Sequence, residues 1–126
     1  GDLHRHLYGV LDYLQGRGCR IGGVTQGADG MVWYDETGTR RHLPALALPP
    51  QNVVDTNGAG DIFHGAYMYS ALARPDLPWL DHFTFARAAS AHAVQHLGNE
   101  ASLPDLRDID RAVATWPERA SAIAAE

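Results

Sequence analysis

The segment that says most about the fold of this chain is Val53-Val-Asp-Thr-Asn-Gly-Ala-Gly-Asp-Ile-Phe-His-Gly-Ala66. An apolar run leads into a polar turn with two glycines, and a helix is predicted to begin there. The first N–H groups of a helix have no partner inside it, and the helix dipole places partial positive charge at that end. Gly58 and Gly60 let the backbone bend sharply and come close to a ligand. The segment therefore predicts an anion site built from backbone N–H groups.

Asp61 stands at the N-cap or in the first turn of the predicted helix, and two roles are open to it. It is either a capping residue, a common role for aspartate, or a base that accepts the proton of a hydroxyl group attacking a phosphoryl group. Asp55 is either a turn former or an oxygen ligand for a cation beside the same turn. His64 either contacts a substrate or has a packing or surface role on the helix.

The basic residues exclude several kinds of reaction and of binding site. All ten of them are arginine, and the sequence contains no lysine. This excludes Schiff-base chemistry, lysine bases and the phosphate-binding loops that depend on lysine. With 15 acidic residues, a net charge of −5 and a pI of about 5.7, the surface repels a nucleic-acid backbone, so no nucleic-acid partner is expected. Any bound phosphate must be held by backbone N–H groups, arginine or a metal.

The cysteine content and the hydropathy of the chain bear on its surroundings. The single cysteine, Cys19, excludes a disulfide framework and a Cys-rich zinc site and fits a reducing compartment, so a cytoplasmic location is expected. No stretch approaches about 18 uninterrupted apolar residues, so no bilayer-spanning segment and no membrane partner are predicted.

The remaining pattern predicts an α/β chain with few strands. Helical spacing of apolar residues, glycine and proline signals and short apolar runs predict elements in the order helix, three strands, three helices. The expected helices are 3–14, 61–73, 79–97 and 105–116, and the expected strands are 20–25, 31–34 and 40–46. This order fits half of a layered α/β fold better than a complete one. A helix already in progress at Leu3 favours a piece of a longer chain, with a complete small protein as the alternative.

Four blocks of the sequence together resemble the ribokinase-like (PfkB-type) carbohydrate kinases. They are Asp55-Thr-Asn-Gly-Ala-Gly-Asp61, Val24-Thr-Gln-Gly-Ala-Asp-Gly30 with the hairpin after it, Phe85-Ala-Arg-Ala-Ala-Ser-Ala-His-Ala93 and Gly98-Asn-Glu-Ala-Ser-Leu-Pro104. The resemblance implies the C-terminal part of a doubly wound α/β/α fold whose N-terminal half is absent. Residues 1–126 would then be the C-terminal nucleotide-binding and catalytic portion of a sugar kinase domain, which phosphorylates a sugar hydroxyl with ATP.

The resemblance also implies roles for individual residues. Asp61 matches the catalytic base, and the backbone of Gly58, Ala59 and Gly60 matches the anion hole. Nucleotide-contacting positions of the family are matched by Thr25, Gly27, Gly30 and, near the adenine, Arg87. Positions that ring a monovalent cation are matched by Asp55, Asn57, Ala93, His96, Gly98 and Ser102. The implied ligands are ATP with Mg²⁺, a small sugar and an activating K⁺.

The N-terminal half of the family fold would lie upstream of Gly1 and supplies much of the sugar pocket and the motif that organises Mg²⁺. The chain is therefore expected to need that missing half or to associate with itself through an exposed sheet edge. Two alternatives to a kinase stay open at this point. One is a truncated nucleotide- or anion-binding module without catalytic activity of its own, and the other is a fragment that folds only by self-association.

Overall fold

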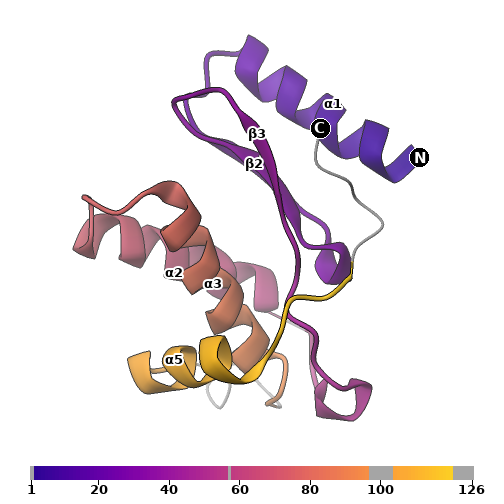
Figure 1. Cartoon of the computed structure of the whole chain (residues 1–126), viewed down its shortest axis with the longest axis vertical. Coiled ribbons are helices and arrows are strands. Elements are labelled where there is room, and N and C mark those ends of the chain that lie inside the picture. The colour runs from indigo at the N-terminus through magenta and orange to yellow at the C-terminus, as the bar shows by residue number, and fades with distance from the viewer. Residues whose placement is uncertain (1, 57, 97–103, 121–126) are drawn as a thin grey trace. The chain divides into compact units, whose positions relative to one another are not determined.

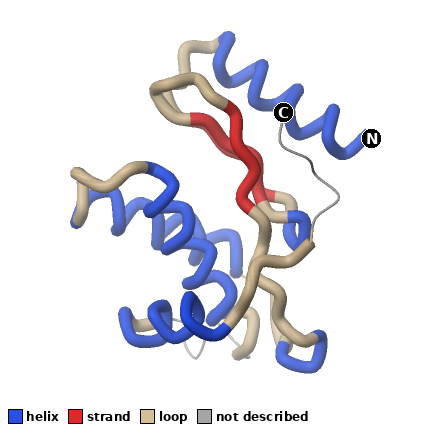
Figure 2. Tube along the Cα trace, in the orientation of Figure 1, coloured by secondary structure: helices blue, strands red, loops and turns tan. Residues whose placement is uncertain are grey.

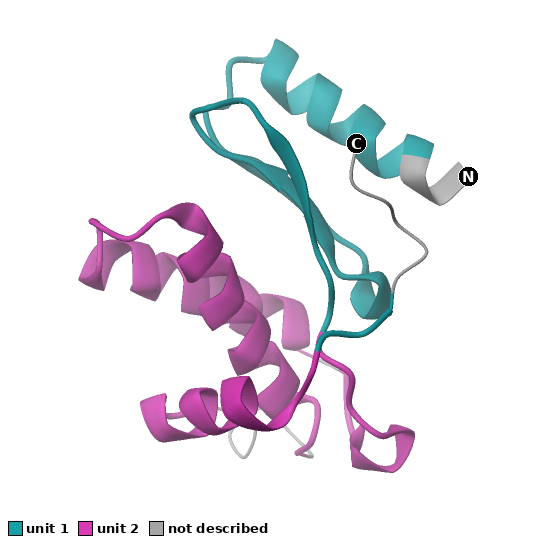
Figure 3. Ribbon diagram, viewed as in Figure 1, with its two compact units in different colours: residues 1–45, 118–126 teal, residues 46–117 magenta. Residues whose placement is uncertain are grey.

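The computed structural model describes residues 2–56, 58–96 and 104–120, which form helices and a small sheet (Figures 1 and 2). The elements are α1 (Asp2–Gly16), β1 (Gly22–Thr25), β2 (Met31–Tyr34), β3 (Arg40–Leu43), α2 (Ala59–Ala73), α3 (Trp79–Ala93) and α5 (Leu106–Thr115). Short 3₁₀ turns occupy Gly27–Asp29 and Pro50–Asn52. The chain divides into two compact units, which Figure 3 colours separately: a sheet unit (residues 1–45 and 118–126) and a helical unit (residues 46–117). No described helix has the length and apolar character needed to cross a bilayer.

The sheet unit contains a three-stranded antiparallel sheet in the order β1-β2-β3. In its register Val32 pairs with Val24 on one side and with His42 on the other. All four residues of the central strand β2 are buried. The turn between β2 and β3 is closed by Asp35, whose side chain accepts hydrogen bonds from the N–H and the hydroxyl of Thr37 at 3.1 and 2.6 Å. These contacts hold the two strands in the hairpin that the sequence predicts.

Helix α1 covers the sheet with the apolar stripe that its sequence spacing predicts. Leu7 and Leu11 are fully buried and pack with Val32 and Tyr34 in one cluster. Burial of each such side chain contributes about 1.5–3 kcal/mol. On the rim of this contact the Arg40 guanidinium donates to the side chains of Gln15 and Asp12. The helix is therefore held on β2 by apolar packing and on β3 by polar contacts.

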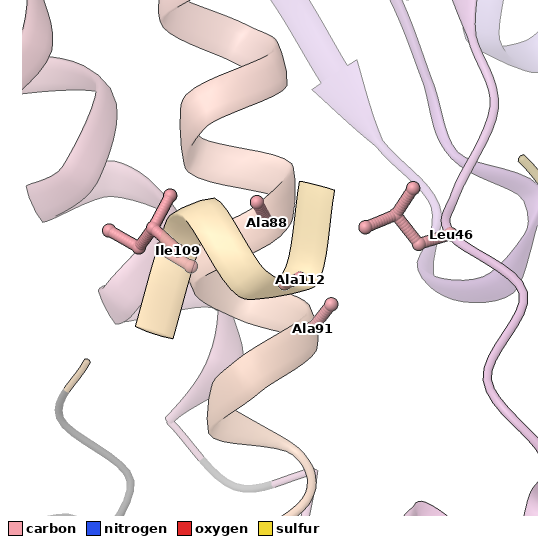
Figure 4. Packing of buried hydrophobic residues seen from close by; sticks show 6 residues of the cluster. Leu46, Ala88, Ala91, Ile109 and Ala112 are labelled. Atoms are coloured by element: carbon pink, nitrogen blue, oxygen red, sulfur yellow. The ribbon is translucent and has the colours of Figure 1, made fainter. Parts of the chain in front are cut away.

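The helical unit has a core made chiefly of alanine. One cluster joins Leu46 to three alanines of α3 and to Ile109 and Ala112 of α5 (Figure 4). The three α3 residues are Ala88, Ala89 and Ala91. Because alanine side chains are short, α5 approaches α3 closely, as the sequence predicts for this alanine-rich helix.

Aromatic rings join α2 to α3 on another side. The ring of Phe83 stacks on Phe63 at a centroid distance of 6.4 Å and makes an edge contact with Tyr67 at 5.7 Å. The ring of Trp79 lies tilted against it at 5.4 Å. Beside them, the buried Ser70 hydroxyl lies 2.8 Å from Nδ1 of His82. The connection between the two helices contains the helix-breaking prolines that predict the break.

Several element boundaries differ from the sequence-based expectation: α1 ends at Gly16 instead of residue 14, and β1 begins at Gly22 instead of residue 20. β3 ends at Leu43 instead of residue 46, because Pro44 has no N–H to donate to a sheet. α3 ends at Ala93 instead of residue 97, because N–H groups of Gln95 and His96 bond to carbonyls three residues back and tighten the chain into a turn. α2 begins at Ala59, two residues before Asp61.

The many apolar residues of α2 predict a largely buried helix, but part of its surface is exposed. Met68, Tyr69 and Leu72 are exposed by 55%, 50% and 82%. The hydrophobic residues of α2 surround the helix, whereas the described residues cover it only toward α3 and part of α5.

Candidate active site

The turn at the start of α2 has the backbone geometry that its glycines predict. Gly58 is the N-cap and adopts the left-handed conformation, with φ 78° and ψ −3°. Its carbonyl accepts the N–H of Ile62 at 3.0 Å, which starts the helical ladder. A Cβ atom placed on Gly60 would meet no atom within 4 Å. The turn is thus open at Gly60, where a ligand has room to approach the backbone.

Asp61 is the third residue of α2 and its side chain is exposed. The possibility that Asp61 is the N-cap is wrong, because Gly58 takes that position and brings no side chain. Asp61 is instead the acid of the first turn, where the helix dipole stabilises a carboxylate. Its carboxylate is therefore accessible and next to the open backbone turn.

A cavity of about 680 Å³ opens beside Asp61, within the range of small-molecule sites. It is lined by Gly58, Asp61, Ile62, Gly65, Ala66 and Tyr69 of α2 and its N-cap, Phe85 and Ala89 of α3, and Pro104, Asp105, Leu106 and Ile109 at the start of α5. The rings of Tyr69 and Phe85 stack at 5.9 Å and give the cavity an aromatic wall. Most of the lining is apolar, so the two carboxylates stand out.

The second carboxylate, Asp105, has a structural task. It caps α5 by accepting the N–H of Asp108 at 2.8 Å, and the Asp108 side chain accepts the N–H of Asp105 in return. The hydrogen bond from the Asp108 backbone holds the pKa of Asp105 below its ordinary value. Asp105 is therefore a fixed negative charge, and of the two acids Asp61 is the one free of capping duties.

The residues expected around a cation are partly brought together. The N–H groups of Val54 and Asp55 donate to the carbonyl of Val94 at 2.7 and 3.1 Å, which places Asp55 beside the end of α3 where Ala93 lies. His96 follows in the same turn, and its N–H donates to the Ala93 carbonyl at 3.1 Å. Asn57, Gly98 and Ser102 lie outside the described residues.

The histidines near this turn interact with each other. His92 and His96 have ring centroids 4.4 Å apart, and Nε2 of His92 lies 3.6 Å from a carboxylate oxygen of Asp108. Burial holds the pKa of His92 below its ordinary value, although Asp108 acts in the opposite direction. Within residues 2–56, 58–96 and 104–120, no three His, Cys, Asp or Glu side chains are grouped so as to hold a metal ion.

The expected nucleotide-contacting residues fall in both units. Thr25 ends β1, and Gly27 and Gly30 lie in the β1–β2 connection of the sheet unit, where the N–H of Gln26 donates to the Gly30 carbonyl at 2.7 Å. Gly30 has φ 82°, and a Cβ atom there would lie 2.2 Å from the Leu43 carbonyl oxygen. Gly30 is thus required by backbone packing, independently of any ligand. Gly27, with φ 45°, has open space around it.

Arg87 and the aromatic wall show where sequence reasoning was incomplete. Arg87 is half-buried in α3 and is not among the residues that line the cavity. Tyr69 and Phe85 do line it, although the sequence indicated no site role for either. The only signal that could have pointed to Tyr69 is the apolar character of α2 on all its sides, which does not tell a cavity wall from a core.

Comparison with known proteins gives a family match, a similar sequence and similar solved structures. The family model "pfkB family carbohydrate kinase" matches residues 9–106. The chain is 32% identical over 98 residues to the ribokinase of Mus musculus, a match that covers 77% of this chain and 29% of the mouse protein. The structure resembles that of ribokinase from Thermotoga maritima with a TM-score of 0.73 and 21% identity, covering 90% of this chain and 39% of that one.

A second solved structure adds sequence similarity to the likeness in fold. It is the aminoimidazole riboside kinase from Salmonella enterica, complexed with aminoimidazole riboside and an ATP analogue, with a TM-score of 0.69 and 30% identity over 82% of this chain and 34% of that one. The chain thus spans about a third of the length of these relatives. The expected α/β class, with three strands and four helices among the described residues, is confirmed as part of the ribokinase fold. With most of its length matched by the family model, the chain belongs to the pfkB family of carbohydrate kinases.

Proposed function

We propose that the chain is the nucleotide-binding and catalytic portion of a kinase that transfers the γ-phosphoryl group of ATP to a hydroxyl group of a sugar or a nucleoside. One observation carries the proposal: an exposed carboxylate, Asp61, stands two residues into a helix whose glycine turn is open to a ligand. Membership of the pfkB family and the riboside kinase of Salmonella enterica, solved with an ATP analogue, support it.

The proposed chemistry divides between backbone and side chain. The N–H groups of Gly58, Ala59 and Gly60, with the positive end of the α2 dipole, stabilise the negative charge that builds up on the transferring phosphoryl group. Asp61 accepts the proton of the attacking hydroxyl. Because the chain has no lysine, phosphate charge is balanced by backbone N–H groups, arginine and a bound cation. In this proposal Thr25, Gly27, Gly30 and Arg87 contact the nucleotide.

The cations of the proposal fit the oxygen atoms present. The backbone N–H of Asp55 bonds to the carbonyl of Val94, the residue after Ala93, and carboxylate and carbonyl oxygens such as those of Asp55 and Ala93 suit a hard cation such as K⁺. Asn57, His96, Gly98 and Ser102 would complete that ring. Mg²⁺ would be carried by the phosphates of ATP, where it neutralises developing charge.

The acceptor and the assembly are further parts of the proposal. The relatives are named for ribose and for a riboside, so a pentose or a riboside is the first acceptor class to test. The groups that bind the acceptor would come partly from the portion of the relatives' length that this chain does not cover, or from a second copy of the chain. The coverage of about a third also favours a second candidate, a nucleotide-binding module without turnover of its own.

Substitution of Asp61 tests the proposal. In a phosphorylation assay with ATP, Mg²⁺ and a panel of pentoses and ribosides, Asp61→Asn should lower kcat by about 10²–10⁴-fold, the scale of a positioned proton acceptor. ATP affinity and Tm should stay near those of the unaltered chain, because the anion hole is backbone. Asp110→Asn, an exposed acid of α5, is the matched control and should leave turnover unchanged.

Two results would count against the kinase. Near-normal turnover in Asp61→Asn would remove Asp61 from the mechanism. ATP binding without any phosphorylated product, by the unaltered chain and with every acceptor, would support the binding module instead.

A further inference from the structure

His64 makes a hydrogen bond that the proposed chemistry has not used. It is the basic residue of α2, whose sequence holds neither arginine nor lysine. Its ring Nδ1 lies 2.8 Å from the carbonyl oxygen of Gly60. A carbonyl oxygen can only accept, so Nδ1 carries the hydrogen and donates it. In the neutral ring this fixes the tautomer and leaves the proton off Nε2.

The acceptor of this bond belongs to the proposed phosphate-binding turn. The carbonyl of Gly60 and the N–H of Asp61 are the two ends of one peptide unit. A hydrogen bond to the oxygen of a peptide polarises it and makes its N–H a stronger donor, because hydrogen bonds in a chain reinforce one another. The ring of His64 thus acts, through a single peptide, on the N–H of the proposed catalytic residue.

Neighbouring rings support the orientation of the imidazole. Its centroid lies 5.5 Å from that of Tyr67 and 6.3 Å from that of Phe63, which meets it edge-on. Both neighbours pack on Phe83 in the aromatic contact between α2 and α3. A rotation of His64 away from Gly60 would lose these contacts as well as the hydrogen bond. The exposed ring is therefore held in place more firmly than its position on the helix surface implies.

We propose that His64 is a positioning residue of the phosphate-binding turn. Its Nδ1–H holds and polarises the Gly60–Asp61 peptide, so that the Asp61 N–H meets a phosphate group as a strong and fixed donor. The inference rests on the proposed function, because it assigns His64 a role in the same site. It does not require His64 to touch the substrate.

Two substitutions separate the hydrogen bond from the packing. His64→Phe keeps a ring beside Tyr67 but removes the donor. His64→Asn removes the ring but can place an amide N–H where Nδ1 stands, since both atoms are two bonds from Cβ. His6→Phe, at an exposed histidine of α1, is the control for loss of an imidazole elsewhere.

The measurement is an NMR titration of each chain with ATP, following the Asp61 amide, with Tm recorded alongside. His64→Phe should weaken ATP binding about threefold to tenfold, the scale of one modest hydrogen bond. His64→Asn should stay within about twofold of the unaltered chain, and His6→Phe should match it. Ring ¹⁵N shifts of the unaltered chain, without ligand, should show the Nδ1–H tautomer.

The possible outcomes are distinguishable. Equal affinity in His64→Phe and the unaltered chain would overturn the inference and leave the proposed function standing. Equal weakening in the Phe and Asn variants would also overturn it, because an N–H donor restored at the position of Nδ1 would then recover no affinity. An Asp61 amide that does not respond to ATP in the unaltered chain would overturn this inference, whereas Gly58, Ala59 and Gly60 amides that do not respond would overturn the proposed phosphate turn. Should His64→Phe fail to fold, a ring tautomer other than Nδ1–H would still refute the bond.

Discussion

The sheet unit and the helical unit bury their apolar residues in different ways. In the sheet unit the buried side chains are large: Trp33 and Tyr34 of β2 are each 1% exposed. In the helical unit most of the buried residues of α3 are alanines such as Ala88 and Ala89, while Leu72 of α2 is 82% exposed. The sheet unit therefore encloses its own core, whereas the helical unit leaves large apolar side chains uncovered by the described residues.

This difference matters because the candidate catalytic turn lies in the helical unit. An alanine core lets helices approach closely, but each alanine removes little apolar surface from water, and the gain is about 0.8 kcal/mol for each buried CH₂ group. A helix that is apolar on all sides, as α2 is, is typical of the interior of a larger protein. The candidate catalytic turn therefore lies in the unit whose alanine-rich cluster contributes the less apolar burial to stability.

The largest loss of stability is expected in the helical unit, when the ring of Phe83 is removed. Phe83→Ala deletes the ring that contacts Phe63, Tyr67 and Trp79, and should lower the free energy of unfolding by about 3–5 kcal/mol. Urea unfolding measures the loss, and amide hydrogen exchange locates it. Protection should fall within residues 46–117, while β1, β2 and β3 keep theirs. Leu80→Ala, at an exposed leucine of the same helix, should cost less than about 1 kcal/mol, and equal losses would refute the central place of Phe83.

The corresponding change in the sheet unit acts on the backbone. Gly30→Ala forces a Cβ atom against the Leu43 carbonyl at a positive φ, which should cost about 2–4 kcal/mol by thermal or urea unfolding. Gly27→Ala also meets a positive φ but has open space, so only about 1–2 kcal/mol is expected. Similar losses for the two variants would mean that the contact with Leu43 does not set the requirement for glycine.

The smallest expected effect concerns pH and the end of α3. Burial lowers the pKa of His92, so the unfolded chain binds more protons than the folded one as the pH falls through about 6.5. Acidification from pH 7.5 to 5.5 should therefore lower the Tm of the unaltered chain more than that of His92→Gln. The difference should stay below about 4 °C, the shift produced by about 1 kcal/mol.

Four charged neighbours of His92 set the size of this effect. His96 and Arg111 lower the pKa of His92 further, whereas Asp108 and Asp105 raise it. A larger acid-induced loss in His92→Gln than in the unaltered chain would contradict the assigned direction.

Sequence reasoning succeeded where local chemistry decides the structure. Gly38 and Asp35 close the hairpin, Pro75 and Pro78 separate α2 from α3, and Gly58 opens the helix that carries Asp61. Each of these features depends on residues close together in the chain. The α/β class followed from their order.

The features that were not predicted depend on residues far apart in sequence. The need for glycine at Gly30 comes from the backbone of β3, and the exposure of Tyr69 depends on what packs against α2. The cavity beside Asp61 is made by residues from three helices. No periodicity in a single segment carries that information.

The Val94 carbonyl has a consequence for how the turn can move. It accepts two N–H groups, those of Val54 and Asp55, and the Ser90 hydroxyl of the same helix donates to the Ala59 carbonyl at 3.3 Å. The segment that leads into the turn and the first residue of α2 are therefore both tied to the last turns of α3. A ligand that displaces the turn must stretch these bonds or carry the end of α3 with it. Displacement of the turn is therefore mechanically coupled to displacement of a whole helix, and the stiffness of α3 resists it.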